Sequence, residues 1–366
     1  MELTACRELK VPAQGLLPAG RFRFGQRIAS VRADDAAFRE RFLRLYFDCL
    51  EPSGRGLGSR AVRLDVFRGR SQDSVQVEIS EHSDDFDPGI VEMLIPELRL
   101  TSVNCAVPGG WRVYAGPDDP SEPVLAAREG RLILDARLPW QLLAGHYFVH
   151  HVMRLQPDVL FLHAASLVVG GRGILLCGNK AHGKSTLALA LAARGHGFLG
   201  DEIAAIHART GTSLPFRRTV SIREGPQDDR VKAFLARREP DRETLADGST
   251  RVRVRMSEVF PDAPAPRASL SDALFLCGFS ERPRAEAFEF STNDLHRLGP
   301  LQATFTGRPA GGRALELLKL FAQVRCYRIW VGGTPQQTAR LIEQVLEGEW
   351  ATVSSKRPNP SERFGG

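Results

Sequence analysis

The six cysteines of this 366-residue sequence are spread singly along the chain. They form no C-x-x-C pair and have no histidine at ligand spacing, which argues against zinc and iron–sulfur sites. No apolar run reaches the ~18 residues that a membrane-spanning helix requires. The N-terminal segment also lacks the basic and apolar pattern of a signal peptide. We therefore expect a cytoplasmic protein with reduced thiols and no membrane partner.

Charge of one sign is not abundant either. The sequence has 49 Lys and Arg against 43 Asp and Glu, a formal net charge of +6. This excess suits anionic ligands such as nucleotides but is too small to predict a nucleic-acid partner. Hydrophobic residues make up 43% of the chain, which is ordinary for a globular protein with a sizeable core.

The chain divides by pattern into three parts. Residues 36–50 repeat apolar side chains every three or four positions, which predicts a helix, and neighbouring segments alternate as half-buried strands do. His150 and His151 have no ligand partner nearby in sequence, so we expect them to be structural or surface residues. We predict an α+β domain over residues 1–140 that binds the acceptor or regulates, a catalytic domain over 141–350 and a disordered tail over 351–366.

One motif carries specific chemistry. Residues 178–185 read GNKAHGKS and fit G-x-x-x-x-G-K-[ST], the Walker A phosphate-binding loop, between an apolar strand pattern and an Ala- and Leu-rich helix pattern. Loop N–H groups and the helix N-terminus would bind phosphate, Lys184 would reach the β- and γ-phosphates, and Ser185 would ligate Mg²⁺. We expect ATP and Mg²⁺ as ligands. The expected nucleotide-binding residues are Gly178, Asn179, Lys180, Ala181, His182, Gly183, Lys184, Ser185 and Thr186.

Two acids and a histidine complete the candidate site. Asp201 and Glu202 follow Lys184 by seventeen and eighteen residues, near the end of the next predicted strand. One carboxylate can accept the acceptor's proton while the other helps Ser185 to bind the metal, although an acidic pair can also simply end a strand. His163 lies in an apolar strand pattern that pairs beside the loop strand. It can hydrogen-bond the catalytic carboxylate, or it can be a core histidine.

Together these features resemble the catalytic core of the HPr kinase/phosphorylase family and its HPr-kinase-like relatives. The resemblance covers residues 163–202, in which the histidine, hairpin, loop, helix-ending RGH and acidic pair align without a gap. It implies a mixed α/β (α+β) kinase core like that of phosphoenolpyruvate carboxykinases. It also implies ATP-dependent phosphorylation of a serine on a protein or peptide, with Asp201 as the base, His163 as its contact and Lys184 on the phosphates.

The sequence departs from that family in several places. Glu202 stands where the bifunctional enzymes have a second Asp, His182 replaces a small loop residue, and no phosphorolysis signature is found downstream. A diverged relative is therefore expected. Such relatives are often encoded beside genes of peptide natural-product or other specialised pathways, and some modify a precursor peptide. Family members that form hexamers make a homo-oligomer a further expectation.

Other functions share the same residues. A kinase of a small-molecule hydroxyl needs the same residues to bind ATP, which we call the donor half of the site. A nucleotide-dependent switch or binding module needs no phosphate transfer at all. We find no later apolar strand ending in Asp and no N-K-x-D motif, which favours a kinase. Arg217, Arg218 and Arg223 are candidates for the site wall, with surface positions as the alternative. The alternating RVRVRM at 251–256 predicts an edge strand with a basic face, suited to an acidic peptide or only to solvent.

Overall fold

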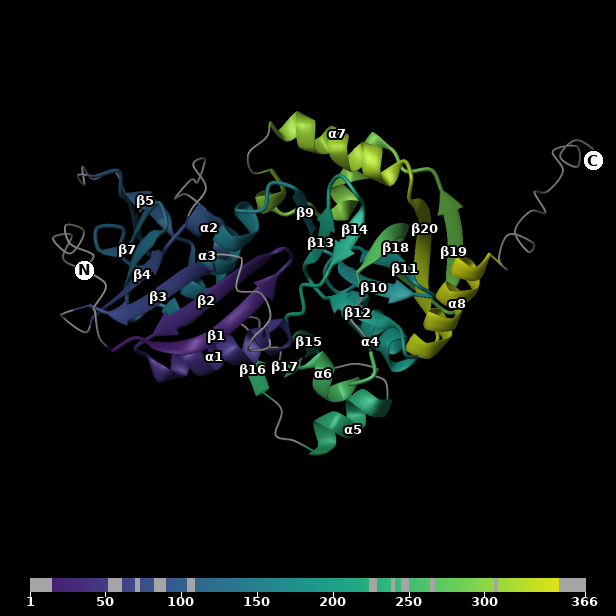
Figure 1. Ribbon diagram of the computed structural model, residues 1–366, viewed down its shortest axis with the longest axis horizontal. Helices are drawn as coiled ribbons and strands as arrows, with labels where there is room; N and C mark the ends of the chain where they lie inside the picture. The colour runs from purple at the N-terminus through teal and green to yellow at the C-terminus, as the bar shows by residue number, and fades with distance from the viewer. Residues whose placement is uncertain are drawn as a thin grey trace, which may run out of the picture.

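The fold is described from a computed structural model, shown in Figure 1. The described residues are 15–51, 61–69, 73–81, 90–103, 109–223, 229–237, 241–244, 250–263, 267–305 and 309–348. They form a mixed α/β structure with three sheets of eight, nine and three strands. Within these ranges no helix has the length and apolarity needed to cross a membrane. The tail predicted over 351–366 lies outside the described residues.

The first sheet takes its strands from the N-terminal part of the chain, in the order β1-β2-β3-β4-β8-β7-β6-β5. All neighbouring strands are antiparallel except β2 and β3, which run parallel. The strands are β1 (Leu17–Phe24), β2 (Arg27–Ala33), β3 (Val62–Arg68), β4 (Ser74–Ile79), β5 (Thr101–Val103), β6 (Arg112–Ala115), β7 (Pro123–Arg128) and β8 (Arg131–Asp135).

Two helices cover one face of this sheet. Helix α1 (Ala36–Tyr46) begins where the Asp35 carboxylate accepts the N–H of Phe38, and it buries the apolar residues that its sequence spacing had placed on one side. Helix α3 (Trp140–Arg154) is buried almost all round, and both His150 and His151 lie inside. Shorter helical pieces are η2 (Phe47–Cys49), α2 (Val91–Leu94) and η4 (Pro96–Leu98).

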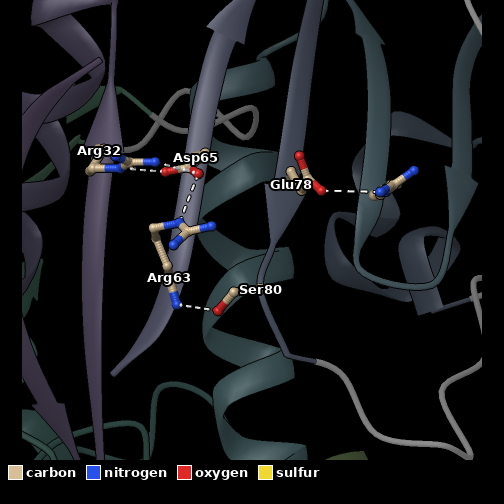
Figure 2. Close-up of polar contacts among 6 residues, drawn as sticks. Arg32, Arg63, Asp65, Glu78 and Ser80 are labelled. Atoms are coloured by element: carbon tan, nitrogen blue, oxygen red, sulfur yellow. Dashed lines mark hydrogen bonds and ion pairs between the residues drawn. The ribbon is translucent and has the colours of Figure 1, made fainter. Parts of the chain in front are cut away.

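The opposite face of the first sheet carries paired charges. Figure 2 shows Arg32 and Arg63 directed at Asp65, and Glu78 directed at an arginine on a neighbouring strand. Arg32 donates Nε and Nη2 to the two Asp65 oxygens at 2.7 Å, and Arg63 Nε adds a third bond at 2.9 Å. Asp65 is thus 1% exposed with both oxygens bonded, which makes burial of its charge tolerable.

The second sheet holds the strands of the predicted catalytic segment. Its order is β12-β10-β11-β18-β14-β13-β9, with β20 also paired to β18 and β19 to β20. Strands β11, β18 and β20 run parallel to one another, and the others pair antiparallel. The strands are β9 (Val159–Leu162), β10 (Ala165–Val169), β11 (Arg172–Cys177), β12 (Gly197–Gly200), β13 (Ala204–His207), β14 (Thr212–Leu214), β18 (Ala268–Ser280), β19 (Arg284–Phe288) and β20 (Arg325–Gly332).

Helices cover both faces of this sheet, as Figure 1 shows. Alternate residues of β11 face opposite sides, with Ile174 and Leu176 packing toward α4 (Lys184–Ala193) and α8 (Pro335–Glu347). Leu175 and Cys177 pack on the other side with α7 (Ala310–Phe321). Burial on both faces explains why β11 is continuously apolar in sequence. Two 3-10 segments, η5 (Thr292–Leu298) and η6 (Gln302–Phe305), connect β19 to α7.

The third sheet is small and corrects one expectation. Its order is β15-β17-β16, so β17 (Thr250–Val254), predicted to be an edge strand, lies in the middle. The alternation of Arg and Val remains, but its basic positions Arg251 and Arg253 stand opposite Glu243 and Asp241 of β16 in the pairing register. The other elements here are β15 (Val220–Arg223), β16 (Asp241–Thr244), α5 (Asp229–Arg237) and α6 (Met256–Val259).

The first and second sheets share one core. Phe216, in the segment that follows β14, has its ring 5.3 Å from that of Phe24 in β1 and 6.3 Å from that of Phe161 in β9. Helix α3 belongs to the same cluster, although its sequence lies mostly in the predicted catalytic segment. The packing of the first region therefore continues into the sheet that carries the phosphate-loop motif.

Candidate functional site

The motif at 178–185 lies between the end of β11 and the start of α4. Gly178 has a φ of 153°, and a side chain there would meet the Leu276 backbone oxygen at 3.1 Å. Gly183, with a φ of 87°, is the residue before the helix. Both positions need glycine, the first for close approach and both for conformation. The N–H groups of Ala181 and Gly183 donate to no other described residue, which leaves donors at the start of a ten-residue helix.

Lys184 folds back over this loop. Its Nζ donates to the backbone oxygens of Gly178 at 2.8 Å and Asn179 at 3.1 Å. Burial lowers the pKa of Lys184, although the nearby charge of Asp201 opposes the shift. The ammonium group is thus held against the loop by carbonyl oxygens, where a bound phosphate would meet it.

Asp201 lies directly after β12 and faces the start of α4, the helix that follows the loop. Its Oδ2 accepts the hydroxyl of Ser185 at 2.7 Å, whereas its Oδ1 is buried with no hydrogen-bond partner among the described residues. The residue is 2% exposed. Burial, followed by the charge of Glu202, raises the pKa of Asp201 from 3.8 to about 6. Since the folded state holds this proton more tightly than the unfolded chain, ionising Asp201 costs stability as the pH rises from about 4 to about 6.

Glu202 turns the chain in a conformation that is uncommon for glutamate. Its φ is 66°, in the left-handed region, and its carboxylate forms an ion pair of 3.4 Å with Arg218. Burial acts to raise the pKa of Glu202, but the charges of Arg218 and Arg253 outweigh it, so the pKa is lowered. The two neighbouring acids thus have their pKa values shifted in opposite directions, as is found where one binds protons and the other stays ionised.

His163 contacts the acidic pair through the backbone. Its Nδ1 donates to the Glu202 carbonyl oxygen at 3.1 Å, not to the Asp201 carboxylate that the resemblance implied. Burial and then the charge of Lys184 lower the pKa of His163. The residue also lies in the bend between β9 and β10, not inside a strand, and its N–H donates to Gly299 at 2.7 Å. The chain bends here because β9 and β10 pair with different strands.

Of the remaining predicted residues that the structure describes, only His182 has a side-chain hydrogen bond at the loop. His182 bonds through Nδ1 to the Leu276 oxygen of β18 at 2.9 Å, which fixes its ring against the wall of the loop. Arg217 is partly buried, and its Nε and Nη2 lack partners among the described residues. The side chain of Arg223 lies outside the described residues. Leu276 could not be predicted as a neighbour of His182, because it stands 94 residues away in the chain and the pairing of β11 with β18 brings it there.

The donor set fits a hard divalent cation. The Ser185 hydroxyl and an Asp201 carboxylate oxygen lie 2.7 Å apart, and the second Asp201 oxygen is buried without a partner. Mg²⁺ is bound by few carboxylates together with phosphate oxygens and water. Among the described residues no group of three or more His, Cys, Asp or Glu is placed to hold a metal by itself. Any Mg²⁺ would therefore come with phosphate oxygens as ligands.

A cavity of about 450 Å³ elsewhere has a different character. It lies on the charged face of the first sheet and is lined by Ala61, Arg63, Glu78, Ile79, Ser80, Glu129 and Arg131. The charges of its two arginines and two glutamates cancel, and no described lining residue has a buried polar atom without a hydrogen-bond partner. Beside the loop, by contrast, a buried oxygen of Asp201 has no hydrogen-bond partner among the described residues, so the loop is the better candidate site.

No family model and no curated protein matches this sequence. Among solved structures, the chain is similar to the Hpr(Ser) kinase/phosphatase from Coxiella burnetii. That match has 14% identity and a TM-score of 0.24, and it covers 53% of this chain and 99% of the other.

Proposed function

We propose that this protein is a kinase that transfers the γ-phosphate of ATP to a serine hydroxyl of a protein or peptide. The observation that carries the proposal is Asp201, a buried carboxyl group with one oxygen on Ser185, the other oxygen unpaired and a pKa raised to about 6. A general base works best with a pKa near the working pH. The Oδ1 atom of Asp201, which is buried without a partner beside the loop, can accept the proton of a serine hydroxyl that attacks the phosphate.

The donor half of the reaction follows from the loop. The free N–H groups and Lys184 would bind the phosphates of ATP, which makes residues 178–186 a P-loop. Ser185 and Asp201 would hold Mg²⁺, and the ion, when bound, would neutralise charge on the phosphates. Asp201 takes the proton of the attacking hydroxyl while the new oxygen–phosphorus bond forms and the bond to the leaving ADP oxygen breaks.

The neighbouring groups support Asp201 without replacing it. Glu202 stays ionised beside Arg218, and its charge helps to raise the pKa of Asp201. His163 holds the carbonyl of the same turn and so positions the acidic pair. The low exposure of Asp201 also limits water at the base, which favours transfer to a bound hydroxyl over hydrolysis.

The donor half serves a small-molecule hydroxyl equally well, and a nucleotide-dependent switch would use only the loop. A switch gives no reason for a buried acid with a raised pKa, so we favour transfer. A protein or peptide acceptor is the more specific proposal, because the sequence resemblance points to it.

Labelled transfer tests this function. The purified protein is incubated with Mg²⁺, γ-labelled ATP and a pool of cellular peptides, with Leu315→Ala as a matched surface control and Lys184→Ala as the loop variant. We expect labelled phosphoserine, found by mass spectrometry, with wild type and control but not with Lys184→Ala. Label confined to small molecules would establish the other kinase. Label found only as inorganic phosphate, or none, would contradict transfer.

A further inference from the structure

One large aromatic side chain is exposed beside the loop. Among the described residues three large apolar side chains are exposed: Leu17, Leu315 and Phe279, the last most of all at 69%. Most other described phenylalanines are buried in the cores. A single exposed Phe is unremarkable in itself, so its location decides whether it matters.

Phe279 lies at the carboxyl end of β18, between two parallel neighbours that also end at the loop. Strand β11 on one side leads into Gly178, and β20 on the other pairs Phe279 with Val331. Atoms of both Phe279 and Val331 lie 3.9 Å from the point that a side chain on Gly183 would occupy. Ligands bind outside the carboxyl ends of parallel strands in such sheets. The ring and Val331 therefore form an apolar step against the phosphate loop.

A bulge accounts for the outward position of the ring. The pairing of β18 with β20 shifts between Leu276 and Gly278, and Gly278 has a φ of 121°. Leu276 is buried, whereas Phe279, after the shift, faces solvent. Bulges commonly redirect a side chain beside a functional site.

The apolar step and Asp201, the proposed base, lie on opposite flanks of the loop strand. Asp201 follows β12, which pairs with β10, and β10 pairs with one edge of β11. Phe279 belongs to β18, which pairs with the other edge of β11. A triphosphate lying across the loop with its γ-phosphate at Asp201 has its nucleoside end on the flank of Phe279.

We propose that Phe279 is the platform on which the base of the nucleotide stacks, with Val331 against the base edge. This inference rests on the proposed function, since it places the rest of the ATP molecule. A phenyl ring offers a π-face and no hydrogen bond, so it holds any base but does not read its polar edge. The site therefore takes ATP and GTP with similar affinity through this residue.

The test separates base from phosphate. Calorimetry with Mg²⁺ measures the affinity for ATP and for inorganic triphosphate, which has no base. The proteins are wild type, Phe279→Ala, Phe279→Trp and the control Leu315→Ala, which removes a comparably exposed side chain from α7 (51% exposed). We expect Phe279→Ala to weaken ATP binding roughly 5- to 150-fold, the value of base–aromatic stacking, without change for triphosphate. Leu315→Ala should match wild type for both ligands.

The tryptophan variant gives a signal that a structural role would not produce. Phe279→Trp should retain ATP affinity, and its added fluorescence should be quenched by ATP and GTP but not by triphosphate. Equal ATP affinity in wild type and Phe279→Ala, or equal losses for ATP and triphosphate, would overturn the platform. If the Phe279 proposal fails in this way but Lys184→Ala still weakens triphosphate binding, the assignment of the loop as a phosphate-binding site is retained. If wild type binds neither ligand, the platform and the proposed function fail together.

Discussion

Asp65 in the first sheet and Asp201 in the second are equally buried, at 1% and 2% exposure, but their surroundings differ. Asp65 receives three bonds from two guanidinium groups, which use both of its oxygens (Figure 2). Asp201 has one neutral hydroxyl on one oxygen, none on the other and a glutamate beside it, and its pKa is about 6. The first carboxylate is stabilised where it is, and the second is left with unused bonding capacity.

This difference separates scaffold from site. Folding tends to pair buried polar groups, so a buried acceptor without a partner indicates a ligand or a reaction. On the charged face of the first sheet, Asp65 and Glu78 have arginine partners on neighbouring strands. Beside the loop of the second sheet, Asp201 keeps a buried oxygen without a partner among the described residues. We infer that the first sheet supports the fold and that the loop edge of the second does the chemistry.

Among the variants tested for ATP affinity, the loop lysine should show the largest effect. Lys184→Ala removes the charge held over the loop and should weaken ATP binding about 100-fold, the order expected for charged hydrogen bonds to phosphate. Calorimetric titration with Mg²⁺-ATP measures the change. Lys180→Ala, which removes an exposed lysine of the same loop, is the matched control and should cost less than tenfold. Equal affinities for wild type and Lys184→Ala would show that the loop does not bind phosphate.

Acid should weaken the scaffold through His150. Burial lowers the pKa of His150 from 6.5 to about 3, and the side chain is 6% exposed on α3. The unfolded chain therefore binds this proton first as the pH falls below 6.5, and the free energy of unfolding decreases. The loss should reach about 2 kcal/mol at pH 5. Urea unfolding at pH 7 and 5 should show a smaller pH effect in His150→Gln than in wild type, and identical effects would contradict this source.

Removing the charge of Asp65 should cost stability and not function. Asp65→Asn keeps an acceptor oxygen but loses charge-assisted bonds from partly exposed arginines, so we expect a loss of about 1–2 kcal/mol in urea unfolding. Glu78→Gln, which removes the negative charge from an ion pair of 3.1 Å with Arg131, should stay within about 1 kcal/mol. ATP affinity of folded Asp65→Asn should equal that of wild type. A selective loss of ATP binding would remove the distinction between the two sheets.

His163 should have the smallest effect. Its bond to the Glu202 carbonyl is of the kind worth about 0.5–1.5 kcal/mol, so His163→Ala should slow transfer by up to about tenfold. His163→Asn, which retains a side-chain N–H donor, should recover part of the rate. Unfolding curves decide between positioning and packing, because a core role would lower stability before it lowered the rate per folded molecule.

Local patterns in the sequence predicted where the loop motif and the acid after the next strand lie in the fold. The glycine and lysine spacing placed residues 178–185 between a strand and a helix, and the distance to Asp201 placed an acid after the next strand. The helix predicted over 36–50 also followed from local periodicity, although α1 ends at Tyr46 and η2 follows it. Such features depend on neighbours in the chain, which a single sequence displays.

What the sequence did not reveal depends on strand pairing. The contact of His163 with the Glu202 carbonyl requires the bend between β9 and β10, and the central place of β17 requires β16 beside it. Phe279 has no motif, and its exposure follows from a register shift between β18 and β20. Pairings of distant strands have no signature in one sequence, so these parts of the site appeared only in the fold.

The most direct test of the account is phosphate transfer by Asp201→Asn, measured beside wild type and Asp65→Asn with γ-labelled ATP and the same peptide pool. We expect Asp201→Asn to bind ATP within a few-fold of wild type, to unfold at no lower urea concentration and to transfer about 10²–10⁴ times more slowly, as loss of a general base predicts. Folded Asp65→Asn should transfer at the wild-type rate. Unchanged transfer by Asp201→Asn would contradict the assignment of Asp201 as the base.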